Sequence, residues 1–464
     1  MVMKDKLYFE DIIFARATPP GYSAIAVIRV SGNNSWQILS KIFDRDKYKS
    51  HQIYHGNIID NNNIIDNVIV LTFAENKSFT GEESFEINCH GNEVIVSLIS
   101  NLLIKNSVRI AEPGEFSKRA FLNKKISLAE AESIMDIVHA STEKSALIAV
   151  RQLSGRLSGE IDIVKEDISN LLAQIEVDID YPEEDISFDT NIFMKNILQI
   201  NNKFDSLLTD FKRGHFFREN IHAVILGKTN SGKSTLFNFL LNEDKAIVSD
   251  IHGTTRDYLD AIINIKGYGI RVYDTAGLRK SNDPIEIEGH KRAIDISKNA
   301  NIILYIISAV EGITDEDKNN INNVPPDKKL LVIINKYDLV SKNNNYINDI
   351  EKFVKTIKNK NDIVKISALK KEGLEYFNDA FIKLLTDDNT EEAEDPIITN
   401  SRHADLLEKA NKNLLTSVER INEELLDLAA FEIREALDRL GEITGEITPT
   451  DIINKIFTSF CVGK

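Results

Sequence analysis

The sequence predicts a multidomain protein of mixed class, in which α/β domains are combined with a helical bundle. Three observations lead to this prediction. Residues 1–122 mix short apolar strands with helices, and residues 219–383 alternate buried strands with amphipathic helices. Residues 123–218 and 384–464 instead repeat apolar residues at spacings of three and four. Because these two helical stretches flank residues 219–383, we expect that segment to be a separate domain inserted into one bundle.

The expected elements follow the chain in a simple order. In the N-terminal segment we expect strands over 24–30, 67–73 and 84–89 and a helix over 94–104. In the inserted segment we expect strands over 221–226, 270–273, 330–334 and 363–366 and a helix over 235–241. A further helical run is expected over 404–440, after an acidic connector over 387–396 that we interpret as a solvated hinge.

Composition narrows the function classes. The 42% hydrophobic and 28% charged fractions are ordinary for a globular protein. No apolar run approaches the roughly 18 residues of a membrane span, and no secretory leader is visible, so we expect a cytoplasmic protein with no membrane contact. Cys89 and Cys461 are too few for a disulfide framework and fit a reducing compartment. The formal net charge of −16 argues against a general nucleic-acid coat protein.

Residues 227–234 carry the most informative motif. They read Gly-Lys-Thr-Asn-Ser-Gly-Lys-Ser and fit the phosphate-loop pattern G-x-x-x-x-G-K-[ST] at every required position. Backbone N–H groups of such a loop, with the positive end of the following helix, form a cradle for phosphate. Lys233 would reach the β- and γ-phosphates, and the Ser234 hydroxyl would bind Mg²⁺. An ordinary strand-to-helix turn is the alternative interpretation.

Two motifs further along the chain are typical of the switches of a GTPase. Residues 253–257, Gly-Thr-Thr-Arg-Asp, lie about twenty residues downstream, where a switch threonine such as Thr255 completes the Mg²⁺ shell. Residues 274–277, Asp-Thr-Ala-Gly, follow a predicted strand. Asp274 is expected to hold Mg²⁺ through water, and Gly277 lets its backbone N–H approach the γ-phosphate.

Two more motifs indicate guanine as the base. Residues 335–338, Asn-Lys-Tyr-Asp, end an apolar strand, and Asp338 can accept hydrogen bonds from N1–H and the 2-amino group of guanine, which adenine lacks. Alone, this pattern is equally consistent with a polar loop. Residues 367–369, Ser-Ala-Leu, resemble the fifth GTPase motif, whose backbone contacts guanine O6. Five motifs in order, each at a strand end, predict a Ras-like P-loop GTPase domain with a mostly parallel sheet.

The predicted nucleotide site draws on all five motifs. Its residues are Asn230, Ser231, Gly232, Lys233, Ser234, Thr235, Ser249, Asp250, Ile251, His252, Gly253, Thr254, Thr255, Asp274, Thr275, Ala276, Gly277, Asn335, Lys336, Asp338, Ser367, Ala368 and Leu369.

Hydrolysis needs a positive charge that these motifs do not supply. A Ras-like GTPase uses a glutamine just after D-x-x-G together with an arginine finger, but Leu278 occupies the glutamine position here. Asn230 lies inside the phosphate loop, where its side-chain oxygen can coordinate a monovalent cation. Residues 249–254 can close over that ion with backbone carbonyls. The alternative is that Asn230 only forms the turn.

Stretches outside these motifs give the chain a family resemblance. They are residues 17–21 with 28–32; residues 79–83 with 89–91, 113–116 and 119–123; and the C-terminus Phe-Cys-Val-Gly-Lys, residues 460–464. End to end, the chain resembles the MnmE (TrmE) family of tRNA-modification GTPases. Val462 stands where the family usually has isoleucine, and His252 where a small residue is common.

The resemblance implies a substrate, cofactors and partners. Family members have a folate-binding N-terminal domain through which they form homodimers, and they assemble with the FAD protein MnmG into a heterotetramer. Together the two proteins modify C5 of the wobble uridine, position 34, of certain tRNAs. They add an aminomethyl or carboxymethylaminomethyl group whose one-carbon unit comes from 5-formyltetrahydrofolate or a related folate. GTP hydrolysis, with GDP as product, uses Mg²⁺ and K⁺.

The resemblance also implies residue roles. The K⁺ ligands would come from Asn230, Ser249, Ile251 and Thr254, and the folate contacts from Arg29, Glu86, Lys125 and Lys464. Without the resemblance, Glu86 and Lys125 read as surface charges. Glu286 matches the water-positioning glutamate, although Glu288 makes this ambiguous and a solvated charge is the alternative. Cys461 is either catalytic or packed, on a tail that we expect to reach the folate pocket of a partner subunit.

Two other functions fit parts of the sequence. A ribosome-assembly GTPase would share the nucleotide motifs and a K⁺ requirement, but such proteins normally carry a basic RNA-binding module or tandem nucleotide domains. A folate-dependent aminomethyltransferase acting alone would not need a GTPase. The sequence leaves open which tRNAs are modified and whether glycine or ammonium is the amine donor.

Overall fold

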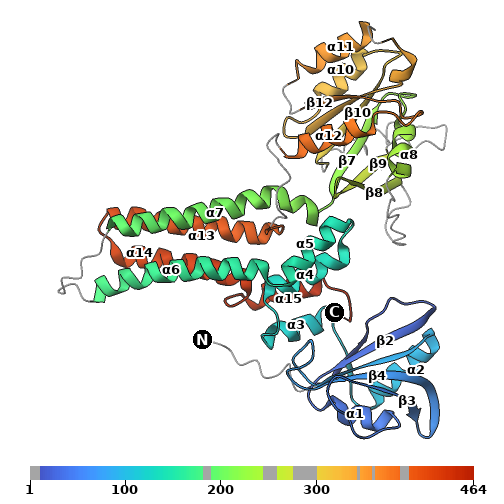
Figure 1. The fold of residues 1–464 in the computed structure, drawn as a ribbon, viewed down its shortest axis with the longest axis vertical. Helices are drawn as coiled ribbons and strands as arrows, with labels where there is room; N and C mark the ends of the chain where they lie inside the picture. The colour runs from blue at the N-terminus through green and yellow to red at the C-terminus, as the bar shows by residue number, and fades with distance from the viewer. Residues whose placement is uncertain are drawn as a thin grey trace. The chain divides into compact units, whose positions relative to one another are not determined.

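The computed structural model describes residues 11–180, 190–243, 259–274, 300–341, 345–357, 361–386 and 397–463. Contacts divide the chain into two compact units, each with its own six-stranded sheet (Figure 1). The first unit comprises Met1–Met135, Gln152–Asp189 and Lys412–Lys464, and the second comprises Asp136–Arg151 and Thr190–Asn411.

The sheet of the first unit has the strand order β3-β4-β5-β2-β1-β6. Neighbouring strands are antiparallel except for β1 and β6, which are parallel. Every strand that the sequence predicted here is present. The bounds are β1 Ile13–Arg16, β2 Ser23–Ser31, β3 Gln52–Asp60, β4 Asn63–Phe73, β5 Ser84–Gly91 and β6 Arg109–Ile110.

Two helices, α1 (Ser35–Ile42) and α2 (Glu93–Lys105), cover one face of this sheet. Alternate residues of the strands are buried beneath them, as a half-covered sheet requires. Ile28 and Val30 of β2 are fully buried, so Arg29 between them points to the opposite face. That opposite face carries Arg29 and Glu86, two of the residues predicted to contact folate.

The remaining helices of the first unit include a long pair, α6 (Arg156–Asp180) and α14 (Leu426–Thr444), which pack side by side. Shorter helices are α3 (Glu115–Leu122) and α15 (Thr450–Thr458), while α4 (Leu128–His139) and α5 (Glu143–Leu153) each cross the boundary between the units. Phe457 and Phe460 of the C-terminal region pack against Leu128 and Met135 of α4. This packing ties the end of the chain to the start of the helical region.

A buried ion network lies beneath the motifs that gave the family resemblance. Arg119 is only 2% exposed and donates hydrogen bonds to Glu82, Glu115 and Asp11. Arg109 reaches the same Glu115 from the surface side. Burial raises the pKa of Glu82 in spite of the Arg119 charge. These residues therefore have a structural role, since each buried charge has an opposite charge beside it.

The sheet of the second unit has the order β12-β11-β10-β7-β9-β8 and is parallel except for the antiparallel pair β8 and β9. This is the mostly parallel sheet that the sequence predicted. The strands are β7 Ile221–Gly227, β8 Leu259–Ile265, β9 Tyr268–Asp274, β10 Ile302–Ser308, β11 Lys329–Asn335 and β12 Asn361–Lys365.

Helices cover both faces of the second sheet. On one face pack α8 (Lys233–Glu243) and α12 (Leu374–Thr386); on the other pack α10 (Asp315–Asn322) and α11 (Asn345–Val354). The long helix α7 (Thr190–Arg218) leads into β7, and a short 3-10 turn, η2 (Tyr337–Leu339), follows β11. The carboxyl ends of β7, β9 and β11 thereby meet at one edge, where the predicted motifs lie.

The helical run expected over 404–440 is two helices rather than one. Helix α13 (Ser401–Asn422) ends shortly before α14, and Glu424 between them has a φ of 60°. A non-glycine residue in this left-handed region cannot continue a helix, which explains the break. Among the helices of the described part, none is both long and apolar enough to cross a membrane.

Candidate nucleotide-binding site

The phosphate loop joins the end of β7 to the start of α8. Gly227, Asn230 and Gly232 have φ values of 144°, 63° and 105°. Positive φ at intervals along a loop turns successive N–H groups toward one side, which produces a concave anion-binding surface. At Gly227 a β-carbon would lie 2.4 Å from the carbonyl oxygen of Ile306, so only glycine fits.

Lys233 is held inside this loop. Its side chain is 8% exposed in the protein, and its Nζ donates to the carbonyl oxygens of Gly227 and Lys228 at 2.7 and 2.6 Å. A phosphate oxygen is a stronger acceptor than a carbonyl, so the ammonium is placed to exchange these partners for phosphate. Ser234 and Thr235 are exposed in the first turn of α8, where a hydroxyl is accessible to a metal ion.

Asn335 connects three of the predicted motifs. Its Nδ2 donates to the carbonyl oxygen of Ser231 at 3.0 Å, and its Oδ1 accepts the N–H of Ala368 at 3.1 Å. The side chain is 3% exposed. Because both ends of the amide are used, Asn335 holds the phosphate loop and the fifth motif at a fixed separation.

Lys336 and Asp338 complete the base-recognition side. Lys336 Nζ donates to the carbonyl oxygen of Asn230 at 2.7 Å. Asp338 lies 3.3 Å from the Nζ of Lys370, a residue that the sequence analysis did not select. The hydroxyl of Ser367 and the ammonium of Lys370 hold the pKa of Asp338 below its usual range. The carboxylate is thus ionised at neutral pH, as two hydrogen bonds from guanine require.

The fifth motif contributes backbone groups in addition to the Ser367 hydroxyl. Ser367 is buried and exchanges backbone hydrogen bonds with Glu372 at 3.0 and 3.1 Å. Leu369 is 83% exposed. The position of Lys370, directly after this motif, was the available signal for its role.

Several predicted residues lie outside the described part of the chain. They are Ser249, Asp250, Ile251, His252, Gly253, Thr254, Thr255, Thr275, Ala276, Gly277, Glu286 and Lys464, together with the side chain of Asp274. The backbone of Asp274 ends β9 and pairs with Ile225 of β7, directly beside the phosphate loop. The sequence motif D-T-A-G therefore begins at the phosphate edge of the sheet.

The predicted folate residues include a pair that the structure brings together. Arg29 and Glu86 are opposite each other on β2 and β5, and Arg29 Nε donates to Glu86 Oε1 at 2.9 Å. The guanidinium also lies 5.9 and 5.7 Å from the ring centres of Phe79 and Phe116. Lys125 instead donates to the carbonyl oxygen of Asn76, at 3.0 Å.

The C-terminal tail lies against this pair. Arg29 NH1 donates to the carbonyl oxygen of Gly463 at 3.4 Å, and a β-carbon at Gly463 would be 2.5 Å from the carbonyl oxygen of Arg16. The Cys461 side chain is exposed, while its carbonyl accepts the N–H of Gly114 at 3.4 Å. We expected the tail to reach a partner subunit; within the chain, it contacts the N-terminal sheet of the same molecule.

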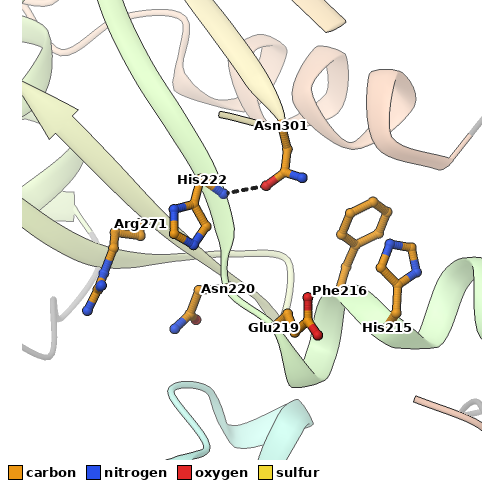
Figure 2. Close-up of a pocket in the computed structure, with 7 residues that line it drawn as sticks. All are labelled: His215, Phe216, Glu219, Asn220, His222, Arg271 and Asn301. Atoms are coloured by element: carbon orange, nitrogen blue, oxygen red, sulfur yellow. Dashed lines mark hydrogen bonds between the residues drawn. The ribbon is translucent and has the colours of Figure 1, made fainter. Parts of the chain in front are cut away.

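A pocket of about 480 Å³ opens at the other end of β7 (Figure 2). It is lined by His215, Phe216, Glu219, Asn220, His222, Arg271 and Asn301. Burial and the nearby Arg271 charge lower the pKa of His222. Since β7 runs from this pocket to the phosphate loop, the pocket is separate from the nucleotide site.

Together, the sheet order, the loop geometry and the base-recognition carboxylate define a P-loop GTPase. A family profile described as the MnmE helical domain matches residues 128–461, and one described as the GTP-binding protein TrmE N-terminus matches residues 12–125. The chain belongs to the MnmE family.

Two relatives named tRNA modification GTPase MnmE agree with this assignment. The tRNA modification GTPase MnmE of Carboxydothermus hydrogenoformans is 42% identical over 466 residues, covering 98% of this chain and 100% of the relative. That of Natranaerobius thermophilus is 40% identical over 464 residues, with 98% and 100% covered. Among solved structures, Aquifex aeolicus Era bound to GDP and aluminium fluoride is 28% identical over 42% of this chain and 66% of Era, with a TM-score of 0.28.

Proposed function

We propose that this chain is a K⁺-dependent GTPase that acts with MnmG to modify C5 of the wobble uridine of certain tRNAs. The group added is aminomethyl or carboxymethylaminomethyl, built with a folate one-carbon unit. One observation carries the proposal: similarity to relatives named tRNA modification GTPase MnmE extends over 98% of the chain and thus includes both units. A GTPase domain shared with unrelated functions would not explain the match to the N-terminal unit.

The nucleotide side of the proposal uses residues already placed at one sheet edge. Lys233 exchanges its two carbonyl partners for the β- and γ-phosphates, and Asp338 exchanges Lys370 for the N–H groups of guanine. The hydroxyls of Ser234 and Thr255 would hold Mg²⁺, which would supply positive charge to neutralise the phosphates. Lys336 and Asn335 keep the loop in place while these exchanges occur.

The K⁺ requirement rests on Asn230. Its φ of 63° leaves the side chain exposed at the rim of the loop, and its carbonyl is already taken by Lys336. The free side-chain oxygen is a hard donor that suits a monovalent cation. With Leu278 in place of glutamine, such an ion supplies the positive charge that an arginine finger gives elsewhere, and Glu286 orients the water.

The folate side of the proposal uses the open face of the N-terminal sheet. Glu86 is 24% exposed, so its carboxylate is accessible to the N–H and amino groups of a pterin. Arg29, held between two aromatic rings, supplies a fixed cation beside it. Lys464 and Lys125 provide further positive charge for the glutamate tail. Cys461 is on the tail that adjoins this pair, where its exposed thiol is available for chemistry.

The assembly we propose is a homodimer through the N-terminal domains that joins MnmG in a heterotetramer and acts in the cytoplasm. A pull-down with the full-length chain distinguishes this from ribosome assembly. We expect co-purification of an FAD-containing protein together with tRNA. Recovery of ribosomal subunits without a flavoprotein would contradict the proposal and favour the alternative.

A further inference from the structure

The turn between β8 and β9 is tight and well defined. Lys266 and Gly267 have φ values of 50° and 91°, as a two-residue hairpin turn of type I′ requires. Ile265 pairs with Tyr268 on either side of it, and Asn264 Oδ1 accepts the N–H of Gly267 at 2.8 Å. The hairpin therefore has one register, fixed at its turn.

A segment more than a hundred residues earlier in the sequence binds this turn. The hydroxyl of Thr142, just before α5, donates to the carbonyl oxygen of Gly267 at 2.8 Å. Ser145 Oγ, at 3.0 Å, is a more distant acceptor for that single proton. Ser145 in turn donates its own proton to the Thr142 carbonyl at 2.9 Å, while Thr142 Oγ1 accepts the Ser145 N–H at 3.1 Å. Each hydroxyl proton thus has one acceptor, and that of Thr142 is Gly267.

Packing surrounds this hydrogen bond. Lys144 Nζ lies 4.9 Å from the ring centre of Phe217, and that ring stacks on Tyr268 at 4.2 Å. A β-carbon at Gly267 would be 2.9 Å from the Cδ of Lys144. Ile148 of α5 belongs to the core of the second unit. The aliphatic stem of Lys144 therefore covers the turn, and a larger residue at position 267 would have to displace this side chain and adopt a φ of 91°.

A second contact is made at Gly269 of β9, two residues after Gly267. A β-carbon at Gly269 would be 2.3 Å from both Ser141 Oγ and Asn220 Oδ1. Ser141 Oγ donates to Asn220 Oδ1 at 2.7 Å, which joins the segment to the residue just before β7. We call Ser141, Thr142 and Lys144 the latch. The contacts described above are all with residues of the second unit, and the chain continues from Asp136–Arg151 into the first unit at both ends.

The far end of the hairpin carries the nucleotide-sensing segments. Leu259, which begins β8, pairs with Asp274, which ends β9. In the sequence, Leu259 lies two positions after the first-switch motif, residues 253–257, and Asp274 opens the D-T-A-G motif. A hairpin of fixed register transmits a tilt at its turn to its open end. The latch thus holds the end of the hairpin that is opposite to the catalytic motifs.

We propose that Thr142 is a positioning residue for GTP hydrolysis, because its hydrogen bond to Gly267 fixes the strands that present both switch motifs to the nucleotide. Thr142 contacts neither nucleotide nor metal and acts through the β8–β9 hairpin. The proposal rests on GTP hydrolysis by this chain and is independent of the tRNA reaction.

The test uses Thr142→Val in the full-length protein, which keeps the shape and removes the donor. We expect kcat for GTP hydrolysis to fall about fivefold or more, because a slightly misplaced catalytic group costs rate rather than binding. The Kd for GDP should stay within about twofold, since the phosphate loop and base site are at the other sheet edge. Thr142→Ser restores the hydroxyl and should restore kcat.

Two controls separate positioning from helix capping and from misfolding. Ser145→Ala removes a capping partner of α5 but keeps the bond from Thr142 to Gly267, so its kcat should match the wild type. An unchanged kcat in Thr142→Val, or an equal loss in Ser145→Ala, would overturn the proposal. In the unmutated protein, amide exchange of residues 141–145 should change together with that of residues 264–269 between GDP and GDP with aluminium fluoride; change in the hairpin alone would also overturn it.

Discussion

A β-carbon at Gly232 would lie 2.1 Å from the Nδ2 atom of Asn335. The phosphate loop and the base-recognition motif, about a hundred residues apart in sequence, are therefore in direct contact before any nucleotide is bound. The same Asn335 amide donates to the Ser231 carbonyl and accepts from Ala368. The proposed phosphate site and the proposed base site are therefore joined through one side chain, that of Asn335.

Gly232→Ala tests this contact. The added methyl displaces Asn335 and also places a side chain at a φ of 105°. We expect the affinity for GDP to fall at least tenfold, equivalent to about 1.4 kcal/mol. Gly159→Ala is the matched control, because no atom lies within 4 Å of its added carbon and it is in the first turn of α6. That control should bind GDP normally and melt at the same or a slightly higher temperature; equal GDP affinity in both variants would contradict this role of Asn335.

Arg119→Met tests the buried ion network. Removing the guanidinium leaves Glu82 and Glu115 buried without it, and such a loss costs about 3–5 kcal/mol of the free energy of unfolding. Trp36 is the only tryptophan in the sequence and is in the same domain, so its fluorescence during urea unfolding reports this unit. Arg109→Met is the control: its guanidinium is 41% exposed, and its loss should cost about 1 kcal/mol or less. Similar costs for the two variants would be inconsistent with this network.

The cost of Arg119→Met should depend on pH. Burial acts to raise the pKa of Glu115, but hydrogen bonds from Arg109, Glu112 and Arg119 outweigh it and lower the pKa below 4.5. A carboxyl with a lowered pKa adds stability above its ordinary pKa, and this is lost as the pH falls through the lowered value. The variant forfeits the Arg119 share of that contribution, so its deficit should be largest near neutral pH and smaller near pH 4. A deficit that grows on acidification would contradict the assignment.

The fold was largely predictable because its strands and helices have strong local signals. The strands of the N-terminal sheet over 24–30, 67–73 and 84–89 and the phosphate-loop context were all recovered as β2, β4, β5, β7 and α8. Strand β10, Ile302–Ser308, was not identified: it is buried along its whole length and apolar except for Ser308, and unlike the strands predicted in this domain it leads into none of the nucleotide motifs. The break at Glu424 was also missed, because apolar residues continue at spacings of three and four through this position.

The candidate site was predictable as motifs but not as contacts. The sequence pointed to Asn335 as part of N-K-x-D, yet its bond to the Ser231 carbonyl is a contact between distant segments that no local pattern encodes. Lys370 was missed because a lysine after the fifth motif reads as a surface charge. Likewise, residues 79–83 contributed to the family resemblance, while only the structure places Glu82 against the buried Arg119.

The monovalent cation can be tested by exchanging salts. If K⁺ occupies the position beside Asn230, GTP turnover should fall by at least about tenfold when Na⁺ replaces K⁺ at equal ionic strength. Asn230→Ala should abolish the difference between the salts. Asn230→Gly should do the same while tolerating the φ of 63° without strain, which separates lost ligation from a distorted loop. Equal rates of the wild type in both salts would exclude this role of Asn230.

The folate site can be tested by direct binding of 5-formyltetrahydrofolate. Glu86→Gln removes the charge that favours two hydrogen bonds from the pterin, and we expect at least tenfold weaker binding, about 1.4 kcal/mol. Deleting the last four residues should also weaken folate binding, because the tail contacts Arg29 through Gly463. Asp60→Asn is a control carboxylate that pairs with Lys105 on the surface of the same domain. GTP hydrolysis should be unchanged in all three; normal folate affinity after the deletion would refute a tail in the pocket.

The central claim is that this GTPase serves tRNA wobble-uridine modification, and mass spectrometry of tRNA nucleosides tests it most directly. Cells lacking this protein should lose the aminomethyl and carboxymethylaminomethyl groups at C5 of uridine 34. Re-expression of the wild type should restore them, and Asp338→Asn, whose amide no longer accepts both guanine donors, should not. Unchanged wobble uridines in the deletion strain, with ribosomal subunits accumulating instead, would contradict this account and favour ribosome assembly.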